Sequence, residues 1–187
     1  MRRSMATTAV SNNFVMRLIG ASALDAAVYE EIEADQGATS QAVAVVLLSS
    51  LAAGIGARGL GGGSFESIVL ISMLALIAWA AWALITFEIG ARLMPEPQTR
   101  SDVGELLRTI GFATAPGMLR VLGVITPVAI PVFALAAVWM LAAMIVAVRQ
   151  ALDYTNTARA IAVCVLGWVL AVSIAIGIGL FYGPTLS

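Results

Sequence analysis

The sequence predicts an all-α protein: a polytopic membrane helix bundle with five transmembrane helices and an N-terminal interfacial amphipathic helix. Three observations lead to this fold class. Apolar residues make up 60% of the 187 residues and charged residues only 11%, whereas a soluble domain has roughly 25% charged residues. Long uncharged runs approach the roughly 20 residues that a bilayer-spanning helix needs. Segments rich in Gly or Pro separate these runs.

The charged residues argue against several classes of function. All 10 basic residues are Arg, 11 residues are acidic, and His is absent. We expect no nucleic-acid partner, because such binding requires a basic surface. We also expect no catalytic residue, no cofactor and no metal, since His is the commonest general base and metal ligand. The single Cys164 lies in an apolar run and has no second thiol with which to pair.

Residues 1–40 are predicted to be a cytoplasmic N-terminal segment, followed by a transmembrane five-helix domain of residues 41–187. The interfacial helix is indicated by apolar residues at helical spacing: Phe14, Val15, Leu18 and Ile19. A polar turn is predicted after it, where acidic residues cluster: Glu30, Glu31, Glu33 and Asp35. We expect no cleavable signal peptide, because residues 4–13 are polar and contain no apolar core.

Five hydrophobic segments are predicted to cross the bilayer: residues 41–57, 67–91, 106–125, 127–148 and 160–182. The first contains about 17 uncharged residues, which reach about 25 Å as a helix and just span the hydrocarbon core. Gly-rich residues 59–64 form a turn after it, because consecutive Gly residues disfavour a helix. Pro95 and Pro97 place a loop after the second segment.

The third predicted segment is the least regular, because Gly and Pro residues and Arg120 interrupt it. We interpret it as a transmembrane helix kinked at Pro116, with Arg120 near its far end. The alternative is an interfacial helix that does not cross. Pro127 and Pro131 then open the fourth segment, since Pro is tolerated in the first turn of a helix.

The distribution of Arg predicts the orientation, because cytoplasmic loops carry an excess of positive charge. With five spans and a cytoplasmic N-terminus, only Arg58 and Arg120 lie outside. With four spans, Arg149 and Arg159 would also lie outside and weaken the bias. We therefore expect a multi-pass protein whose C-terminus is outside. The exclusive use of Arg, with abundant Ala and Gly, indicates a GC-rich bacterial genome and hence the bacterial cytoplasmic (inner) membrane.

Small residues recur every four positions in two of the segments. The fifth segment carries Gly167, Ala171, Ala175 and Gly179, and the fourth carries Ala143 and Ala147. Such stripes let another backbone approach closely, so they predict helix packing or contact with a partner. The spacing alone does not distinguish a neighbouring helix of this chain from a partner protein. We favour the neighbouring helix.

Glu88 and Arg120 are the only charged residues predicted to lie at membrane depth, where ionisable groups are costly. Both lie near the end of a helix, which favours anchoring at the membrane interface over proton or ion transport. Glu88 also precedes Arg92 by four residues, a spacing that places the two side chains on one helix face.

The order of three segments resembles the bacterial branch of the Yip family, named for Ypt-interacting proteins. They are LDAAVYEEIEADQGATSQAVAVVLL (residues 24–48), GFATAPGMLRVLG (111–123) and AVRQALDYTNTARAIAV (147–163). The resemblance implies a five-helix integral membrane protein with a cytoplasmic N-terminus. Eukaryotic members of the family bind small prenylated GTPases. We do not expect a GTPase partner here, because the acidic N-terminal segment is shorter.

These features lead to one preferred functional hypothesis and two alternatives. We expect a non-enzymatic protein that acts by protein–protein contact, as an accessory or scaffold subunit of a larger membrane complex. Its partners would be membrane lipids and other integral membrane subunits. One alternative is a small transporter or permease-like protein that uses the kinked third helix, with a polar cavity reaching Arg120 and including Glu88 or Asp102. The other is a membrane-shaping protein that acts through its N-terminal helix.

Overall fold

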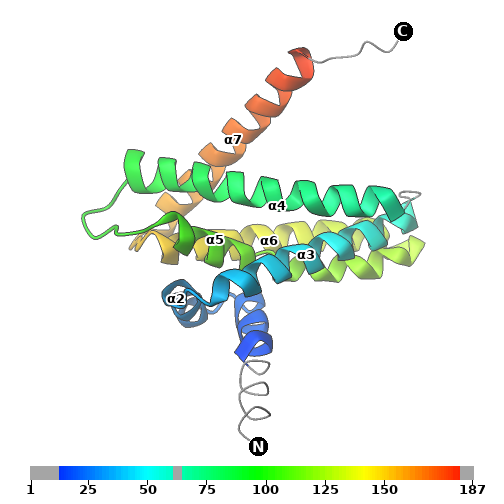
Figure 1. The fold of residues 1–187 in the computed structure, drawn as a ribbon, viewed down its shortest axis with the longest axis horizontal. Coiled ribbons are helices and arrows are strands. Elements are labelled where there is room, and N and C mark those ends of the chain that lie inside the picture. The colour runs from blue at the N-terminus through cyan, green and yellow to red at the C-terminus, as the bar shows by residue number, and fades with distance from the viewer. Residues whose placement is uncertain (1–12, 61–64, 182–187) are drawn as a thin grey trace, which may run out of the picture.

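The computed structural model describes residues 13–60 and 65–181, and in these ranges every regular element is a helix (Figure 1). The first described helix covers residues 13–22. It is followed by α2 (Ala26–Ala34), α3 (Ala38–Gly56), the 3₁₀-helix η1 (Ala57–Leu60), α4 (Phe65–Phe87), the π-helix η2 (Glu88–Leu93), α5 (Val103–Phe112), the 3₁₀-helices η3 (Ala115–Val124) and η4 (Thr126–Val128), α6 (Ala129–Ala151) and α7 (Thr157–Phe181). The predicted all-α class is confirmed for the described residues.

Three of the described helical stretches are long and apolar enough to cross a membrane: Ala38–Gly56, Leu76–Leu93 and Thr126–Ala151. A shorter apolar helix covers Thr157–Leu170. Large apolar side chains also face outward, for example Ile77 at 66% and Ile130 at 74% exposure. Such an exterior suits a lipid solvent better than water. These three helices and the apolar exterior support the prediction of a membrane helix bundle. The number of five spans stays a prediction.

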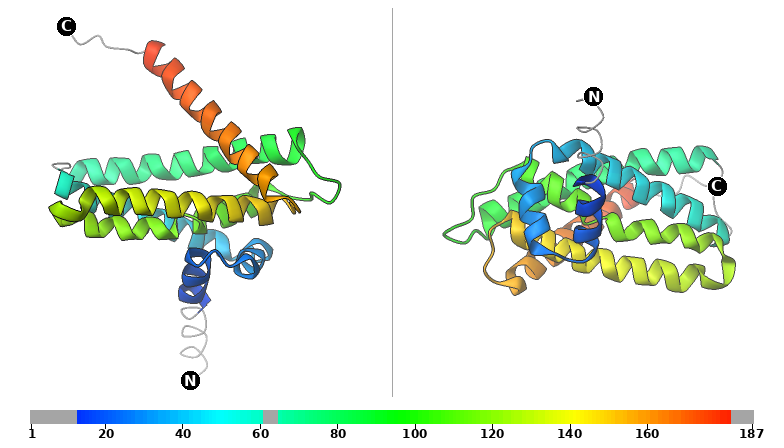
Figure 2. Two further views of the ribbon diagram at one scale, coloured as in Figure 1. Left: turned by 180° about the vertical axis from the view of Figure 1, so that it is seen from behind. Right: turned by 90° about the horizontal axis from the view of Figure 1, so that it is seen from below.

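Four segments lie side by side along the long axis of the molecule, and each runs opposite to the one before it in the chain (Figures 1 and 2). They are α3, α4 with η2, α5 with η3, and α6. Residues 94–102 and 152–156 connect segments at one end, named here the loop end, while η1 and η4 contact each other at the opposite, distal end. The last helix, α7, starts at the loop end and diverges from the bundle, so its C-terminal half lies apart from α4 and α6.

The third segment differs from the predicted single kinked helix. The α-helical part, α5, ends at Phe112, and the chain continues as η3, with Pro116 in its first turn. Pro116 has no amide proton to donate to an α-helical hydrogen bond, which explains the change. A 3₁₀-helix rises about 2.0 Å per residue, so the 10 residues of η3 cover about 20 Å. The combined segment therefore runs the length of its neighbours.

Glycine allows η3 to lie unusually close to α3. A Cβ atom on Gly56 would overlap the backbone carbonyl oxygen of Arg120, and a Cβ atom on Gly117 would overlap the hydroxyl of Ser49. A larger side chain at Gly56 would therefore push the two helices apart, whereas one at Gly117 would first displace the side chains of Ser49 and Met140. The regular α-helix of the third segment is thus replaced by a tighter helix that packs directly on a neighbouring backbone.

The N-terminal helices pack against the bundle instead of standing apart from it. Residues 13–22 and α2 lie across α3, α5 and α6 near the loop end (Figure 2). Tyr29 and Ile32 on α2 are fully buried, three residues apart on one helix face. This burial explains why Glu30, Glu31 and Glu33, which were predicted to lie in a polar turn, are helical, while Asp35 follows α2 as its C-cap residue. On the helix of residues 13–22, Met16 and Ile19 remain exposed.

Candidate functional site

A cavity of about 380 Å³ lies inside the bundle, between α3, α4, α5, η3 and α6. We name it the Arg120 cavity. Most of its wall is apolar, formed by Val, Ala, Ile and Met side chains. The polar and aromatic side chains that line it are Ser49, Ser50, Trp79, Trp82, Thr114 and Arg120. The exposed Ala78 is also part of the lining, so the cavity reaches the surface of the bundle.

The Arg120 guanidinium lies near mid-height in the bundle, although its backbone does not. The backbone carbonyl of Arg120 faces Gly56, the last residue of α3, at the distal end. Its Nη2 atom, however, lies 3.0 Å from Sδ of Met140. Met140 is the middle residue of α6, about 16 Å from either end of that helix at 1.5 Å per residue. The side chain therefore extends inward, away from the nearer end.

Within the described part of the chain, the Arg120 side chain is poorly satisfied. The ion pairs there join Arg17, Arg92 and Arg159 to carboxylates, and Arg120 takes part in none of them. Its Nε is buried without a hydrogen-bond partner, and a thioether such as that of Met140 is only a weak acceptor. The Phe133 ring lies 5.9 Å from the guanidinium carbon and contributes a cation–π contact. Several strong donors are left without an oxygen acceptor.

Trp82 brings a second unsatisfied donor to the same cavity. Its indole Nε1 is buried and has no hydrogen-bond partner among the described residues. Two other tryptophans show the usual arrangement: Trp79 donates to the carbonyl oxygen of Leu107 at 3.1 Å, and Trp139 donates to that of Ser22 at 2.7 Å. A buried indole N–H normally has an acceptor. The Arg120 cavity therefore combines one cation with one neutral donor, both suited to an oxygen acceptor.

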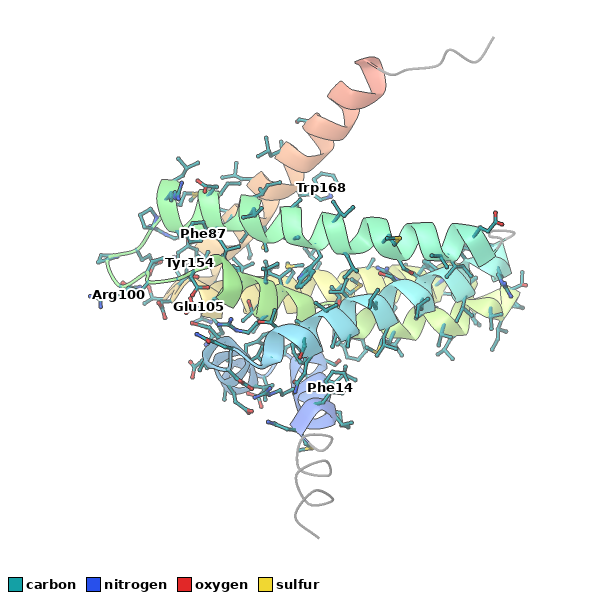
Figure 3. The ribbon with its side chains drawn as sticks, viewed as in Figure 1. Phe14, Phe87, Arg100, Glu105, Tyr154 and Trp168 are labelled. Carbon is teal, nitrogen blue, oxygen red and sulfur yellow. The ribbon has the colours of Figure 1, made fainter. Side chains whose placement is uncertain are left out.

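The loop end contains a larger and different cavity, named here the loop-end basin. Its volume is about 630 Å³, and it lies between α2, α5, residue 98 and residues 149–155. Acidic side chains predominate in its lining: Glu30, Glu33, Glu105 and Asp153. Glu105 and Tyr154, which also lines it, are labelled at this end in Figure 3. Among the described residues, no three potential ligands are arranged to hold a metal ion.

Polar groups around the loop-end basin are largely paired. The backbone carbonyl of Glu33 accepts from the Arg108 guanidinium, and Gln150 donates to Glu30 at 2.9 Å. Partial burial raises the pKa of the Glu33 carboxyl to about 7, and the nearby charges of Glu105, Asp153 and Glu30 add to this shift while Arg108 opposes it. The basin thus contains a carboxyl that titrates near neutral pH.

The two connections at the loop end are joined to each other. Tyr154 is buried, and its hydroxyl donates to the carbonyl oxygens of Gly90 and Met94, both at 2.9 Å. The Glu96 carboxylate accepts from the backbone N–H of Thr155 at 3.0 Å and pairs with Arg159 at 3.3 Å. These hydrogen bonds hold the pKa of Glu96 below its usual range. Residues 94–102 are consequently fixed against the start of α7.

Neither acidic residue that was expected near Arg120 lines its cavity. Glu88 pairs with Arg92 at 2.9 Å, with both side chains more than half exposed. Asp102 caps α5: its carboxylate accepts from the backbone N–H of Glu105, whose side chain in turn accepts from the backbone N–H of Asp102. Of these three predicted candidates, only Arg120 places its charge inside the bundle.

The small-residue stripes lie in different surroundings. Ala143 and Ala147 are fully buried in the core formed with α2, α3 and η3. Gly167 is buried on α7, where a Cβ atom would lie 3.3 Å from the Trp82 ring. The side chains of the remaining predicted positions lie outside the described residues: Ala171, Ala175 and Gly179. The fourth-segment stripe packs internally, and the fifth-segment stripe begins as an internal contact.

The fold and these cavities define a class of protein, an apolar all-helical bundle with three helices able to cross a membrane. The described charges lie mainly at its loop end, apart from a cationic cavity inside the bundle. No protein-family model, no curated protein and no solved structure matches the chain. The resemblance to bacterial Yip proteins stays a prediction.

Proposed function

We propose that this chain is a five-span protein of the bacterial inner membrane that acts, without catalysis, as an accessory subunit bound to another integral membrane protein through α7. The divergence of α7 from the bundle carries this proposal (Figure 1). Gly167 packs against Trp82 on α4, and Ala171, Ala175 and Gly179 continue the same stripe at four-residue intervals along the diverging part of the helix. The sequence thus extends the stripe beyond this internal contact, and a stripe of small residues lets another helix pack closely.

Two observations support five spans and a cytoplasmic loop end. The segment of α5 and η3 runs beside α3 and α6 along the bundle, as a spanning segment should. The described arginines also separate by end: Arg92, Arg100, Arg149 and Arg159 belong to the loop end, and Arg58 belongs to η1 at the distal end. Excess positive charge marks the cytoplasmic side. A reporter fused after Ser187 should therefore be active outside the cytoplasm, and cytoplasmic activity would contradict five spans.

The partner contact can be tested with a matched pair of variants on α7. Ala175→Leu adds bulk to the small-residue stripe, whereas Ser173→Leu adds similar bulk about 160° away around the helix at 100° per residue. Ser173 is exposed. After solubilisation in mild detergent, the wild-type protein and Ser173→Leu should be purified together with a membrane partner. Ala175→Leu should lose most of it. Purification of the wild type as a lone monomer would contradict the proposal, as would equal recovery with both variants.

The transporter alternative is supported by one observation, the Arg120 cavity. That cavity lacks the second charged group that the alternative required, because Glu88 and Asp102 are both engaged elsewhere. A single cation in a largely apolar cavity favours a binding site over a path for ions. If Arg120→Ala abolished the uptake of a solute in intact cells, transport would become the better proposal.

A further inference from the structure

We propose that the Arg120 cavity binds the carboxylate of a single-chain anionic amphiphile, chemically a long-chain fatty acid, whose hydrocarbon chain occupies a neighbouring apolar cavity beside α7. This inference rests on the membrane placement of the bundle but not on the proposed partner subunit. Four features of the described residues support it: the donors in the Arg120 cavity, their charge, the adjacent apolar space and the size of the two cavities.

The donors require an oxygen acceptor that this part of the chain does not supply. The buried Nε of Arg120 and the buried Nε1 of Trp82 have no partners, and both residues line the same cavity. An unsatisfied buried donor costs about 1–3 kcal/mol. A bound carboxylate would offset this cost, because it offers two oxygens with several lone pairs to the guanidinium and, after a small rotation of the indole, to Trp82 Nε1.

The charge of the cavity indicates an anion with one negative charge. Arg120 is the single cationic side chain in the described lining, and no carboxylate is paired with it there. An uncompensated charge inside the bundle is costly, and a counter-ion offsets that cost. The guanidinium fork matches a carboxylate through two parallel hydrogen bonds. A doubly charged phosphate would leave one charge unbalanced.

An apolar cavity lies immediately beyond the two donors. Its volume is about 290 Å³, and it shares Trp82 and Met144 with the Arg120 cavity. The rest of its lining is apolar or a thiol: Leu141, Ile145, Ile161, Cys164, Val165 and Trp168. Met144 can change rotamer readily, since Met is unbranched and flexible. A ligand whose head meets Arg120 therefore reaches an apolar space for its tail once Met144 changes rotamer.

The size of the two cavities favours one hydrocarbon chain. Taken together, the volumes of about 380 and 290 Å³ lie within the roughly 300–1,000 Å³ range of small-molecule sites. A glycerophospholipid brings two chains and a larger headgroup, whereas Trp82 and Met144 connect the Arg120 cavity to the single apolar cavity beside α7. A fatty acid matches both the single charge and the single apolar path.

The test is direct binding of labelled palmitate to the full chain in phosphatidylcholine nanodiscs, at a pH at which the acid is ionised. The wild type should bind palmitate saturably. Arg120→Gln should weaken binding by about tenfold or more, since charge-assisted hydrogen bonds are among the strong ones. Arg58→Gln removes an exposed arginine of η1 at the distal end and should leave binding unchanged. Trp82→Phe keeps the ring, removes the N–H and should weaken binding about threefold.

Competing ligands separate the head from the tail. Hexadecanol has the same chain without the charge, lysophosphatidate has a phosphate head, and acetate has no chain. All three should compete poorly with palmitate. Val165→Trp should narrow the tail cavity and weaken palmitate more than octanoate. If hexadecanol bound equally well, or lysophosphatidate bound in preference, the carboxylate assignment would be overturned. If Arg120→Gln failed to fold, an unchanged affinity in Trp82→Phe and Val165→Trp would overturn the site independently.

Discussion

Arg17 is buried and Arg120 is half-buried, and their surroundings differ. The Arg17 side chain is only 4% exposed and lies 2.9 Å from Glu31 and 2.8 Å from Asp35, with Gln41 as a third acceptor at 3.1 Å. Arg120 has a buried Nε without a partner and one contact to a thioether in the described structure. The first arginine joins the N-terminal helices to α3. The second contributes nothing comparable to packing, which is why a ligand is the better explanation for it.

The two ends of the same bundle therefore use charge differently. At the loop end, carboxylates, guanidinium groups and backbone carbonyls satisfy one another, as in Glu96 with Thr155 and Arg108 with Glu33. Inside the bundle, donors remain available. Burial by itself does not mark a functional group, because satisfied buried groups usually stabilise structure. Burial without partners is the informative observation.

The largest expected effect comes from removing Arg17. Arg17→Met should lower the free energy of unfolding by about 2–3 kcal/mol, somewhat less than for a fully buried pair because Glu31 and Asp35 are about half exposed and regain water. Thermal unfolding in detergent measures this, and Arg92→Met, which removes an exposed pair, is the matched control. An equal effect of both substitutions would contradict the structural role given to Arg17.

Arg120→Met should have the opposite sign. In protein stripped of fatty acid, this change removes an unpaired charge from an apolar cavity and should raise the free energy of unfolding by about 1 kcal/mol or leave it unchanged. The same thermal unfolding assay applies. A loss as large as that of Arg17→Met would show that Arg120 has a structural partner, and the contrast between the two arginines would fail.

Tyr154→Phe should have a moderate and local effect. It removes the hydroxyl that donates to the carbonyl oxygens of Gly90 and Met94 and should cost about 1 kcal/mol for these hydrogen bonds. Hydrogen exchange of residues 94–102 should become faster, while exchange in α3 stays unchanged. Uniformly faster exchange would indicate global destabilisation instead of a local joint.

The smallest expected effect is a pH dependence at the loop-end basin. Because the pKa of Glu33 is raised to about 7 in the folded protein from 4.5, folding favours the protonated carboxyl. Its contribution is fully present below about pH 4.5 and is lost as pH rises through about 7. The protection factors of the α2 amides, from which the base-catalysed intrinsic exchange rate has been removed, should therefore fall over this interval.

A pair of glutamine substitutions separates Glu33 from other titrating groups. Glu33→Gln should flatten the pH dependence of these protection factors in α2. Glu88→Gln, which changes an exposed carboxylate paired with Arg92, should leave it intact. Lowered pKa values at Asp35 and Glu96 act in the other direction, because their stabilisation is lost as pH falls below their usual range. They do not account for a loss on raising the pH.

Much of the fold could be predicted from hydrophobic runs and helix breakers. The predicted segments 41–57, 67–91, 127–148 and 160–182 correspond within a few residues to α3, α4 with η2, α6 and α7, the usual uncertainty of helix ends. In the third segment the sequence located Pro116 but not its consequence. The change to a 3₁₀-helix depends on close packing against α3, which needs the tertiary structure.

The candidate site could be predicted only in part. Arg120 was singled out because it is a charge in an apolar segment, but its backbone position alone suggested anchoring at an interface. The packing of η3 turns the Arg120 side chain inward, toward Met140. This packing depends on the tertiary structure. Trp82 carried no sequence signal, because an indole N–H without a partner is visible only among its neighbours. The four-residue spacing of Glu31, in α2, and Asp35, the residue that ends this helix, was the available signal for the Arg17 contact.

The 3₁₀ geometry of η3 also makes the position of its charge depend on the pitch of the helix. With three residues per turn, Gly117, Arg120 and Gly123 fall on one line along the helix. Gly117 faces Met140 and Gly123 faces Phe133, so this line points into the bundle. Rewinding η3 as an α-helix would shorten it by about 5 Å and turn each successive member of this line by about 60°. Arg120 would then leave the glycine line, so the pitch of one short helix determines whether the cavity contains a cation.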